Sequence, residues 1–326
     1  MGGEFFMDDL NKKFNINIKV MGIGGGGVNA INNMIEYNID GVNFFAANTD
    51  LQDLNRSKTQ YKIQLGPNIT HGLGCGGNVE LGQAATEECI SFLKNILKGT
   101  DFLFLTAGMG GGTGTGATPL IAKVAKDMNI LTLAVVTKPF SFEGGKRTKI
   151  AKSGIINIRP HVDSLIVIPN DKLLDLADKN ITVQDAFKKS NFVLLTAIKG
   201  MTDLMLAKGL INLDFADIKS LLARSGEAIL GFGEAEGENR AKKAALAAVD
   251  SPLFERTIHG ATKFLVNIIG PKDLNLIESS IIVETIREKC GVDVEDVLFG
   301  VSIDEREDNN KIQVILIANS FINKED

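Results

Sequence analysis

The sequence predicts an α/β protein whose first part is a doubly wound, mostly parallel sheet and whose second part is a smaller α/β unit. Two observations support this prediction. In the first half, short continuous apolar runs alternate with amphipathic stretches, which is the pattern of strands buried on both faces and separated by helices. After residue 182 one long amphipathic stretch follows, and beyond it a second, shorter set of strand-like runs begins.

The first strand is expected at Ile16–Met21, a run rich in β-branched residues that ends at a glycine-rich segment. The helix expected next has one apolar face, formed by Val28, Ile31, Met34 and Ile35. Further strands are expected at Val42–Ala47, Phe102–Thr106, Leu131–Val136 and Leu165–Ile168, with helices at Glu80–Leu97 and Ala117–Lys126.

The long amphipathic stretch predicts a helix from about Val183 to Leu206, whose buried face carries Leu194, Ala197, Ile198, Met201 and Met205. Strands are expected after it at Ala261–Ile269, Val297–Ile303 and Ile312–Ala318, with a helix at Leu274–Lys289. We therefore divide the chain into a flexible tail at 1–14, a first domain at 15–182, a connecting helix at 183–208 and a second domain at 209–326.

Composition and charge exclude several classes of protein. Hydrophobic residues make up 44% and charged residues 23% of the 326 residues, which is typical of a globular protein that builds its own core. The net charge of −5 provides no basic surface for nucleic acid. No apolar run reaches the roughly 18 to 20 residues that span a bilayer, so no direct membrane insertion is expected. The three cysteines lack metal-site spacing, and so sparse a set fits a reducing cytoplasm.

Two glycine-rich segments, Gly22–Asn29 and Gly108–Gly116, each follow an expected strand and precede an expected helix. Glycine lets backbone amides approach a phosphate closely and tolerates positive φ angles. The helix behind each loop adds unpaired N–H groups and a partial positive charge, and Thr113 and Thr115 add hydroxyl donors. Two such loops on one sheet predict a site that grips a nucleoside triphosphate from both sides without a lysine.

The first loop alone leaves another enzyme class open. Gly22, Gly24 and Gly27 match the dinucleotide-binding pattern G-x-G-x-x-G, and Asp50 lies 23 residues past Gly27. A nicotinamide-dependent oxidoreductase would explain this loop, but it leaves the second loop unexplained. The chain has no G-x-x-x-x-G-K-[ST] segment, which disfavours a P-loop NTPase.

The second loop contains GGGTGTG at Gly110–Gly116, and with the segments around it the chain from Asn17 to Phe321 resembles the tubulin/FtsZ family. The resemblance is to its FtsZ members more than to tubulin, because the segment GLINLDFAD is typical of FtsZ. The matching segments, in the family's order, are the first glycine loop at Gly22–Asn29, ANTD at Ala47–Asp50, TAGMGGGTGTGATP at Thr106–Pro119, TKPFSFEG at Thr137–Gly144, IPND at Ile168–Asp171 and GLINLDFAD at Gly209–Asp217.

The resemblance implies a Rossmann-like GTPase domain at 15–182, the central helix, and a second domain at 209–326 that carries a catalytic loop. It implies GTP or GDP as ligand, with Mg²⁺ held through the nucleotide and not directly by protein side chains. Glu143 would bind ribose, with Arg147 near the phosphates, and Asn170, Asn191 and Phe187 would bind guanine. The implied phosphate-binding residues are Gly24, Gly25, Gly26, Asn29, Gly74, Gly76, Gly110, Gly111, Gly112, Thr113, Gly114 and Thr115.

The resemblance also implies self-assembly into head-to-tail filaments for the cell-division ring, in the cytoplasm at the division site. In such a filament Asn212, Asp214 and Asp217 would act on the GTP of the neighbouring subunit. Tethering and regulatory proteins are the expected further partners, although the chain ends at Asp326 without the family's usual C-terminal binding peptide. A filament protein for plasmid partition or cell shape, and a paralogue that binds nucleotide but hydrolyses it poorly, are alternatives with the same fold.

Simpler interpretations exist for several of these residues. Asp214 and Asp217 could stabilise a helix N-terminus by about 1 kcal/mol, Phe187 could be a core aromatic, and Asn170 could be a turn residue after Pro169. Cys75 could be a redox thiol, but a tolerated small side chain is the simpler interpretation. The loop around Cys75, which senses the γ-phosphate in the family, departs from the usual pattern at His71 and at 75–79.

Overall fold

The computed structural model describes residues 16–39, 41–175, 181–206, 210–291, 294, 296–304 and 310–321. The expected tail at 1–14 lies outside these residues. So do 207–209, where the connecting helix is expected to end and the catalytic loop to begin.

Six parallel strands form the N-terminal part of the described sheet. They are β1 (Ile18–Ile23), β2 (Val42–Asn48), β3 (Tyr61–Gln64), β4 (Phe102–Gly108), β5 (Leu131–Lys138) and β6 (Ser164–Pro169), in the spatial order β3-β2-β1-β4-β5-β6. β1 pairs on both sides, so that Ile18 lies opposite Val42 of β2 and Phe102 of β4. The direction of the strand order reverses between β1 and β4, which is where ligands bind in open α/β sheets.

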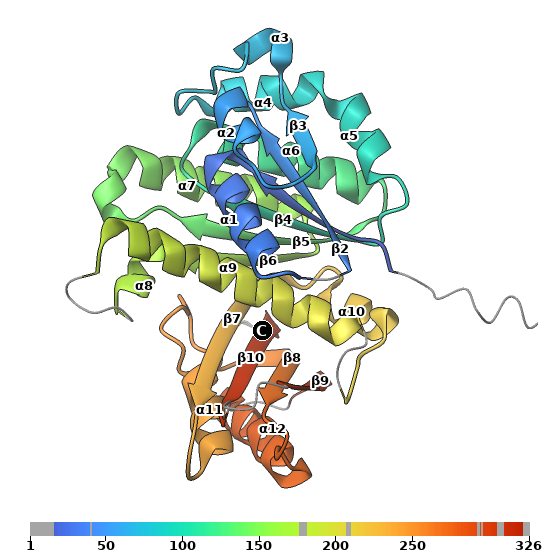
Figure 1. Ribbon diagram of the computed structural model, residues 1–326, viewed down its shortest axis with the longest axis vertical. Helices are drawn as coiled ribbons and strands as arrows, with labels where there is room; N and C mark the ends of the chain where they lie inside the picture. Colours follow the sequence, from blue (N-terminus) through green and yellow to red (C-terminus); the bar gives the residue numbers. More distant parts are fainter. Residues whose placement is uncertain are drawn as a thin grey trace, which may run out of the picture.

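Helices cover both faces of these strands (Figure 1). One face carries α1 (Gly24–Glu36) and α9 (Val183–Met205), and the other carries α4 (Val79–Glu88), α5 (Ile90–Leu97), α6 (Gly112–Asp127) and α7 (Gly145–Ile158). β4 and β5 are buried almost throughout as a result. Short helical segments complete this part: α2 (Leu51–Asn55), α3 (Pro67–Thr70), α8 (Asn170–Asp175) and two 3₁₀ turns at Ser141–Glu143 and Arg159–His161.

The long strand β7 (Gly226–Ala235) continues the sheet into the second part. Its first three residues pair in parallel with β6, and the rest pair antiparallel with β10 (Ile312–Phe321). β10 pairs antiparallel with β8 (Ala261–Gly270), and β8 pairs in parallel with β9 (Asp296–Ile303). α11 (Arg240–Val249) and α12 (Leu276–Cys290) share a hydrophobic core with these strands, and α10 (Phe215–Leu222) precedes β7.

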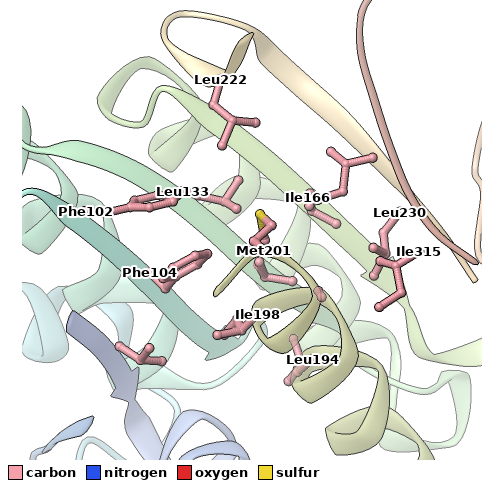
Figure 2. Close-up of a cluster of buried hydrophobic side chains, with 14 of the residues drawn as sticks. Phe102, Phe104, Leu133, Ile166, Leu194, Ile198, Met201, Leu222, Leu230 and Ile315 are labelled. Carbon is pink, nitrogen blue, oxygen red and sulfur yellow. The ribbon is translucent and has the colours of Figure 1, made fainter. Parts of the chain in front are cut away.

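The central helix α9 packs against both parts of the molecule. Figure 1 shows it crossing between the N-terminal sheet and the C-terminal strands, with α8 beside one end and α10 beside the other. One cluster of buried side chains joins all three regions (Figure 2). It contains Phe102, Phe104, Leu133 and Ile166 from the N-terminal sheet, Leu194, Ile198 and Met201 from α9, Leu222 from α10, and Leu230 and Ile315 from the C-terminal strands.

This architecture confirms the expected α/β fold, with a mostly parallel first sheet, a long central helix and a smaller second α/β part. Two helices differ from expectation. The single helix expected at Glu80–Leu97 is interrupted at Cys89, whose ψ is 4°. The helix expected from Ala117 already begins at Gly112, so the second glycine loop itself forms the first turn of α6.

Candidate functional site

A cleft of about 580 Å³ opens at the carboxyl ends of the parallel strands. Ile23 at the end of β1, Gly108 at the end of β4, Thr137 near the end of β5 and Asn170 just after β6 all line it. The cleft therefore lies over the position where the strand order reverses, as expected for the ligand site of an open α/β sheet.

Two helix N-termini form one end of this cleft. α1 begins at Gly24 and α6 at Gly112, and neither helix has a side chain that caps its first turn. The N–H groups of both first turns are therefore left for a ligand, and both helix dipoles favour an anion there. The lining at this end includes the predicted residues Gly24, Gly25, Gly26, Asn29, Gly111, Gly112, Thr113 and Gly114.

The two loops are packed so closely that side chains would separate them. A Cβ atom at Gly24, where φ is 69°, would lie 2.9 Å from the backbone nitrogen of Gly114. A Cβ atom at Gly27 would lie 2.5 Å from the carbonyl oxygen of Thr106. Glycine at these positions lets α1 approach both α6 and β4, which brings the two sets of amides together.

A third loop, residues 71–78, closes over the same end. Gly74 and Gly76 line the cleft as predicted, and so does Cys75 between them. The Thr113 hydroxyl lies 2.6 Å from the Thr49 hydroxyl, and the Cys75 Sγ lies 3.3 Å from Thr49 Oγ1. These buried polar contacts tie the third loop to the first turn of α6.

Glu143 and Arg147, the predicted ribose and phosphate contacts, line the cleft side by side. The Arg147 guanidinium donates to Glu143 Oε2 at 2.6 Å, and the backbone N–H of Phe140 donates to Glu143 Oε1 at 3.0 Å. The carboxylate is therefore fixed in place, whereas Arg147 is exposed and can turn toward a ligand.

The far end of the cleft has the composition of a base-binding site. Asn170 is 4% exposed, and its Oδ1 accepts a hydrogen bond from the Ser190 hydroxyl at 2.8 Å, which leaves the amide NH₂ group as a donor. Phe187 is 41% exposed and packs edge-on against buried Phe140, with ring centroids 5.2 Å apart. Asn191 also lines this end. α9 thus brings Phe187 and Asn191 to Asn170 at the end of β6.

Sequence reasoning did not single out Asn48, which the structure places in the cleft wall at the end of β2. The residue is 2% exposed, and its Nδ2 has no hydrogen-bond partner, although its Oδ1 accepts from the backbone N–H of Asp50 at 3.3 Å. An unpaired buried amide donor is costly, so Asn48 indicates a polar ligand in the cleft. Its place in the ANTD segment was the available signal.

Some predicted residues do not line the cleft. Gly110 and Thr115 belong to the second loop but are not among the residues that line the cleft, and the Gly110 N–H donates to Thr115 Oγ1 at 2.9 Å. Asn212, Asp214 and Asp217 lie beyond the other end of α9, at the start of α10. The structure thus brings the predicted nucleotide-binding residues together but leaves the predicted catalytic residues apart from them.

Among the described residues, no group of three or more His, Cys, Asp or Glu side chains is placed to hold a metal ion. Three separate carboxylates do line the cleft, on Asp50, Asp53 and Glu143. No helix in the described part of the chain is both long enough and apolar enough to cross a membrane.

Comparison with known proteins identifies the family. Residues 17–178 match the family model for the GTPase domain of the tubulin/FtsZ family, and residues 226–321 match the model for the C-terminal domain of the FtsZ family. The FtsZ of M. jannaschii, solved as an empty dimer, is 39% identical over 96% of this chain and 90% of that one, with a TM-score of 0.90. The chain belongs to the tubulin/FtsZ family.

Two other members of the tubulin/FtsZ fold are more distant. CetZ1 from Haloferax volcanii, a GDP-bound monomer, is 22% identical, with 94% of this chain and 95% of that chain covered and a TM-score of 0.81. CetZ2 from the same organism, a GTPγS-bound protofilament, is 20% identical, with 95% of this chain and 94% of that chain covered and a TM-score of 0.78. These two show the shared fold.

As a tubulin/FtsZ family GTPase, the chain binds guanine nucleotide, and the cleft over the strand ends is the candidate site.

Proposed function

We propose that this chain assembles head to tail into filaments and hydrolyses GTP at the contact between subunits. The observation that carries this proposal is the separation between the cleft and the predicted catalytic residues. Leu194 is the last residue of α9 that lines the cleft, and α9 runs on to Met205, which is about 16 Å, or three turns, further along the helix. The Leu213 N–H donates to the Leu204 carbonyl at 3.1 Å, so the next residue, Asp214, lies near the C-terminal end of α9. At that distance its side chain cannot reach the cleft of its own subunit.

The predicted catalytic acids are presented to the outside of the subunit. Asp214 occupies the N-cap position of α10, yet its side chain accepts no capping hydrogen bond. Asp214 and Asp217 are both exposed. The loop before them is held in place, because the Leu210 N–H donates to the Val301 carbonyl at 2.7 Å and the Val301 N–H donates to the Ile211 carbonyl at 3.0 Å. A rigid loop with uncommitted carboxylates favours a role outside this subunit over helix capping.

A second copy placed head to tail would bring this loop to the open side of the first copy's cleft. Such a contact joins two different surfaces and does not close on itself, so it extends into a filament. The solved FtsZ dimer and the CetZ2 protofilament support self-association of this chain.

In the proposed reaction each subunit supplies half of the machinery. The first-turn N–H groups of α1 and α6 bind the phosphates, orient them, and offset the negative charge that develops during transfer. Asp214 and Asp217 of the neighbour orient and polarise the attacking water, and Asn212 of the neighbour lies close to the γ-phosphate. Hydrolysis then depends on assembly, because neither half acts without the other.

Mg²⁺ bound through the nucleotide is the expected metal, and the residues of the cleft fit it. Asp53 Oδ2 would lie 3.2 Å from a Cβ atom at Gly25, so one carboxylate borders the first loop, and Asp50 lies nearby in the same wall. Carboxylates suit a Mg²⁺ ion that keeps most of its waters, and both would hold it through water. When bound, the ion would neutralise charge on the phosphates.

We place these filaments in the cell-division ring, in the cytoplasm at the division site, where tethering and regulatory proteins bind them. The match of 226–321 to the FtsZ C-terminal domain and the 39% identity to an FtsZ favour this role over plasmid partition or cell shape. In this arrangement 15–182 binds GTP, 183–208 connects, and 209–326 carries the catalytic loop to the neighbour.

The dependence of turnover on protein concentration tests the proposal. Phosphate release per molecule should rise steeply with concentration and then level off, while light scattering from GTP-dependent assembly appears over the same range. A lone subunit lacks the neighbour's acids and should be nearly inactive. Constant turnover per molecule from far below to far above the assembly threshold would contradict a shared site.

A further inference from the structure

Cys75 lies where the third loop meets the phosphate end of the cleft. It is 7% exposed and lines the cleft, and its Sγ lies 3.3 Å from Thr49 Oγ1 and 3.5 Å from Thr113 Oγ1. Thr113 belongs to the first turn of α6, whose N–H groups face the predicted phosphate position. The thiol is thus within hydrogen-bond distance of the phosphate cradle itself.

Packing leaves one direction for a group attached to this sulfur. A Cβ atom at Gly112 would lie 2.7 Å from the Cys75 Cβ, so the α6 side is full. The open side is the cleft, which Asn48 also lines. The buried Nδ2 of Asn48 has no hydrogen-bond partner among the described residues, which independently favours a polar ligand in this cleft. A substituent on Cys75 would therefore occupy space that the nucleotide needs.

The loop that carries Cys75 has the backbone freedom to expose it. Gly74, Gly76 and Gly77 all have positive φ angles, of 77°, 54° and 81°. A Cβ atom at Gly76 or Gly77 would meet no other atom within 4 Å, so this segment is not packed against the rest of the protein. Glycines in such a segment allow the loop to change conformation at low cost.

We propose that Cys75 is a redox modification site, at which a mixed disulfide with a small thiol and a bound nucleotide exclude one another. In the reaction the Cys75 thiolate, after losing its proton to solvent, attacks one sulfur of a low-molecular-weight disulfide. A new S–S bond forms, the original S–S bond breaks, and one small thiolate leaves. Cys75 is oxidised, the small disulfide is reduced, and an excess of reducing thiol reverses the step.

The other two cysteines provide controls within the same chain. Cys89 lies outside the cleft, between α4 and α5, where its Sγ accepts from the Gly66 N–H at 3.4 Å. Cys290 is fully buried in the C-terminal core, and burial raises the pKa of its thiol to about 12, so it has little thiolate. Nucleotide should change the reactivity of Cys75 and of neither control.

The test treats the full chain with glutathione disulfide, without nucleotide and with GDP at 100 times its Kd. Peptide mass spectrometry follows each cysteine separately. Because bound nucleotide depletes the free form, the rate of mixed-disulfide formation at Cys75 should fall about 100-fold, while the rate at Cys89 stays the same. The modified protein should lose nucleotide binding, and dithiothreitol should restore it. In Cys75→Ser, glutathione disulfide should leave nucleotide affinity unchanged.

Three outcomes would overturn the proposal: no reaction of Cys75 without nucleotide, the same rate with and without GDP, or unchanged nucleotide binding by protein modified at Cys75. The inference requires nucleotide binding in this cleft and does not require assembly. If the untreated chain bound no guanine nucleotide in a direct titration, the site itself would be wrong. If it bound nucleotide but Cys75 gained no protection, the inference alone would fail.

Discussion

Gly112 is the first residue of α6, and a Cβ atom added there would lie 2.6 Å from the Asn78 carbonyl oxygen and 2.7 Å from the Cys75 Cβ. Both atoms belong to the third loop, and one of them is backbone, so a side chain could not be accommodated by a rotamer change alone. The phosphate end of the cleft therefore depends on the absence of a side chain at this position.

Gly112→Val should weaken guanine-nucleotide binding by at least about tenfold, because the branched side chain pushes the third loop away from α6 and restricts the loop backbone. Isothermal titration with GDP measures the effect, and circular dichroism checks that the variant is folded. Gly145→Val is the matched control, because a Cβ atom at exposed Gly145 meets nothing within 4 Å. Unchanged affinity in folded Gly112→Val would mean that the second loop is not the phosphate cradle.

At the base end, Asn170 should give selectivity for GTP over ATP. Its side chain is buried and fixed by Ser190, so a base that cannot pair with the amide leaves a polar group unsatisfied. Such sites discriminate by roughly two orders of magnitude or more. Competition titrations with both nucleotides should show this ratio, and Asn170→Leu should reduce it. Equal affinity of the parent protein for GTP and ATP would refute the assignment of this end to guanine.

At the scale of elements, Arg240 holds α11 and α12 together at the start of both helices. Its guanidinium donates to Glu278 at 2.7 and 3.2 Å and to Asp273 at 3.0 Å. Glu278 in turn accepts from the backbone N–H of Asn275, which completes the cap of α12. The pair is mostly buried, with 12% of the Arg240 side chain and 17% of the Glu278 side chain exposed.

Arg240→Gln should lower the free energy of unfolding by about 2 kcal/mol, because Glu278 loses its charged partner in a mostly buried position. The hydrogen bond from Arg240 keeps the pKa of Glu278 below its usual 4.5, so this stabilisation is present above pH 4.5 and is lost as the pH falls below it. Urea unfolding at pH 7 and pH 4 measures both effects. Lys243→Gln, on the exposed side of the same helix, is the control. An equal loss of unfolding free energy in both variants would contradict a stabilising role for the Arg240–Glu278 pair.

Strands and helices with a continuous or periodic apolar pattern could be predicted from the sequence. A strand whose apolar residues are interrupted by glycines and charged residues could not. The expected strand at Leu131–Val136 lies within β5, and the helix expected at about Val183–Leu206 is α9 to within one residue. β7 was not predicted, because its sequence contains several glycines and charges. The structure explains two of the glycines: a Cβ atom at Gly231 or Gly233 would lie 2.2 or 2.0 Å from a carbonyl oxygen of α11. Glycine is needed at these two positions because α11 packs against β7, and that contact cannot be seen in the sequence.

The same limit applies to the site. Loop glycines and the ANTD segment are local patterns, so the glycine-lined end of the cleft could be predicted from the residues together with the family resemblance. The contact between Asn170 and Ser190 joins two elements twenty residues apart, and the unpaired Nδ2 of Asn48 depends on the packing around β2. The two residues lie in recognisable segments, but neither the Asn170–Ser190 contact nor the unpaired state of Asn48 Nδ2 could be predicted from the local sequence.

At the scale of the whole molecule, α9 separates the cleft from the predicted catalytic residues. Its first half lines the cleft, its middle is buried between the two parts of the sheet, and its far end anchors Leu213. Because the middle of α9 is buried in the cluster shown in Figure 2, we expect the spacing to be fixed and Asp214 to stay away from its own cleft. The central claim is therefore that the active site is completed by a second copy.

Asp214→Ala isolates one half of the proposed shared site. The variant should bind GTP as tightly as the parent and lose turnover by about 10²- to 10⁴-fold, the usual cost of one positioned acid–base group. Its unfolding free energy should change little, because the carboxylate caps no N–H group. Glu238→Ala, an exposed acid elsewhere on the second domain, is the control. A drop in melting temperature with normal turnover per folded molecule would identify Asp214 as a helix-stabilising residue instead.

The most direct measurement is phosphate release from a mixture of Asp214→Ala with Gly112→Val. The first variant keeps an intact cleft and the second keeps an intact catalytic loop, so at a GTP concentration that fills only the intact cleft each should be nearly inactive alone. If the site is shared, GTP bound to the first meets the acids of the second, and the mixture should hydrolyse GTP well above the sum of the two. Sedimentation of the mixture shows whether the variants associate. Associated variants whose mixture is no more active than the sum would contradict catalysis across the subunit contact.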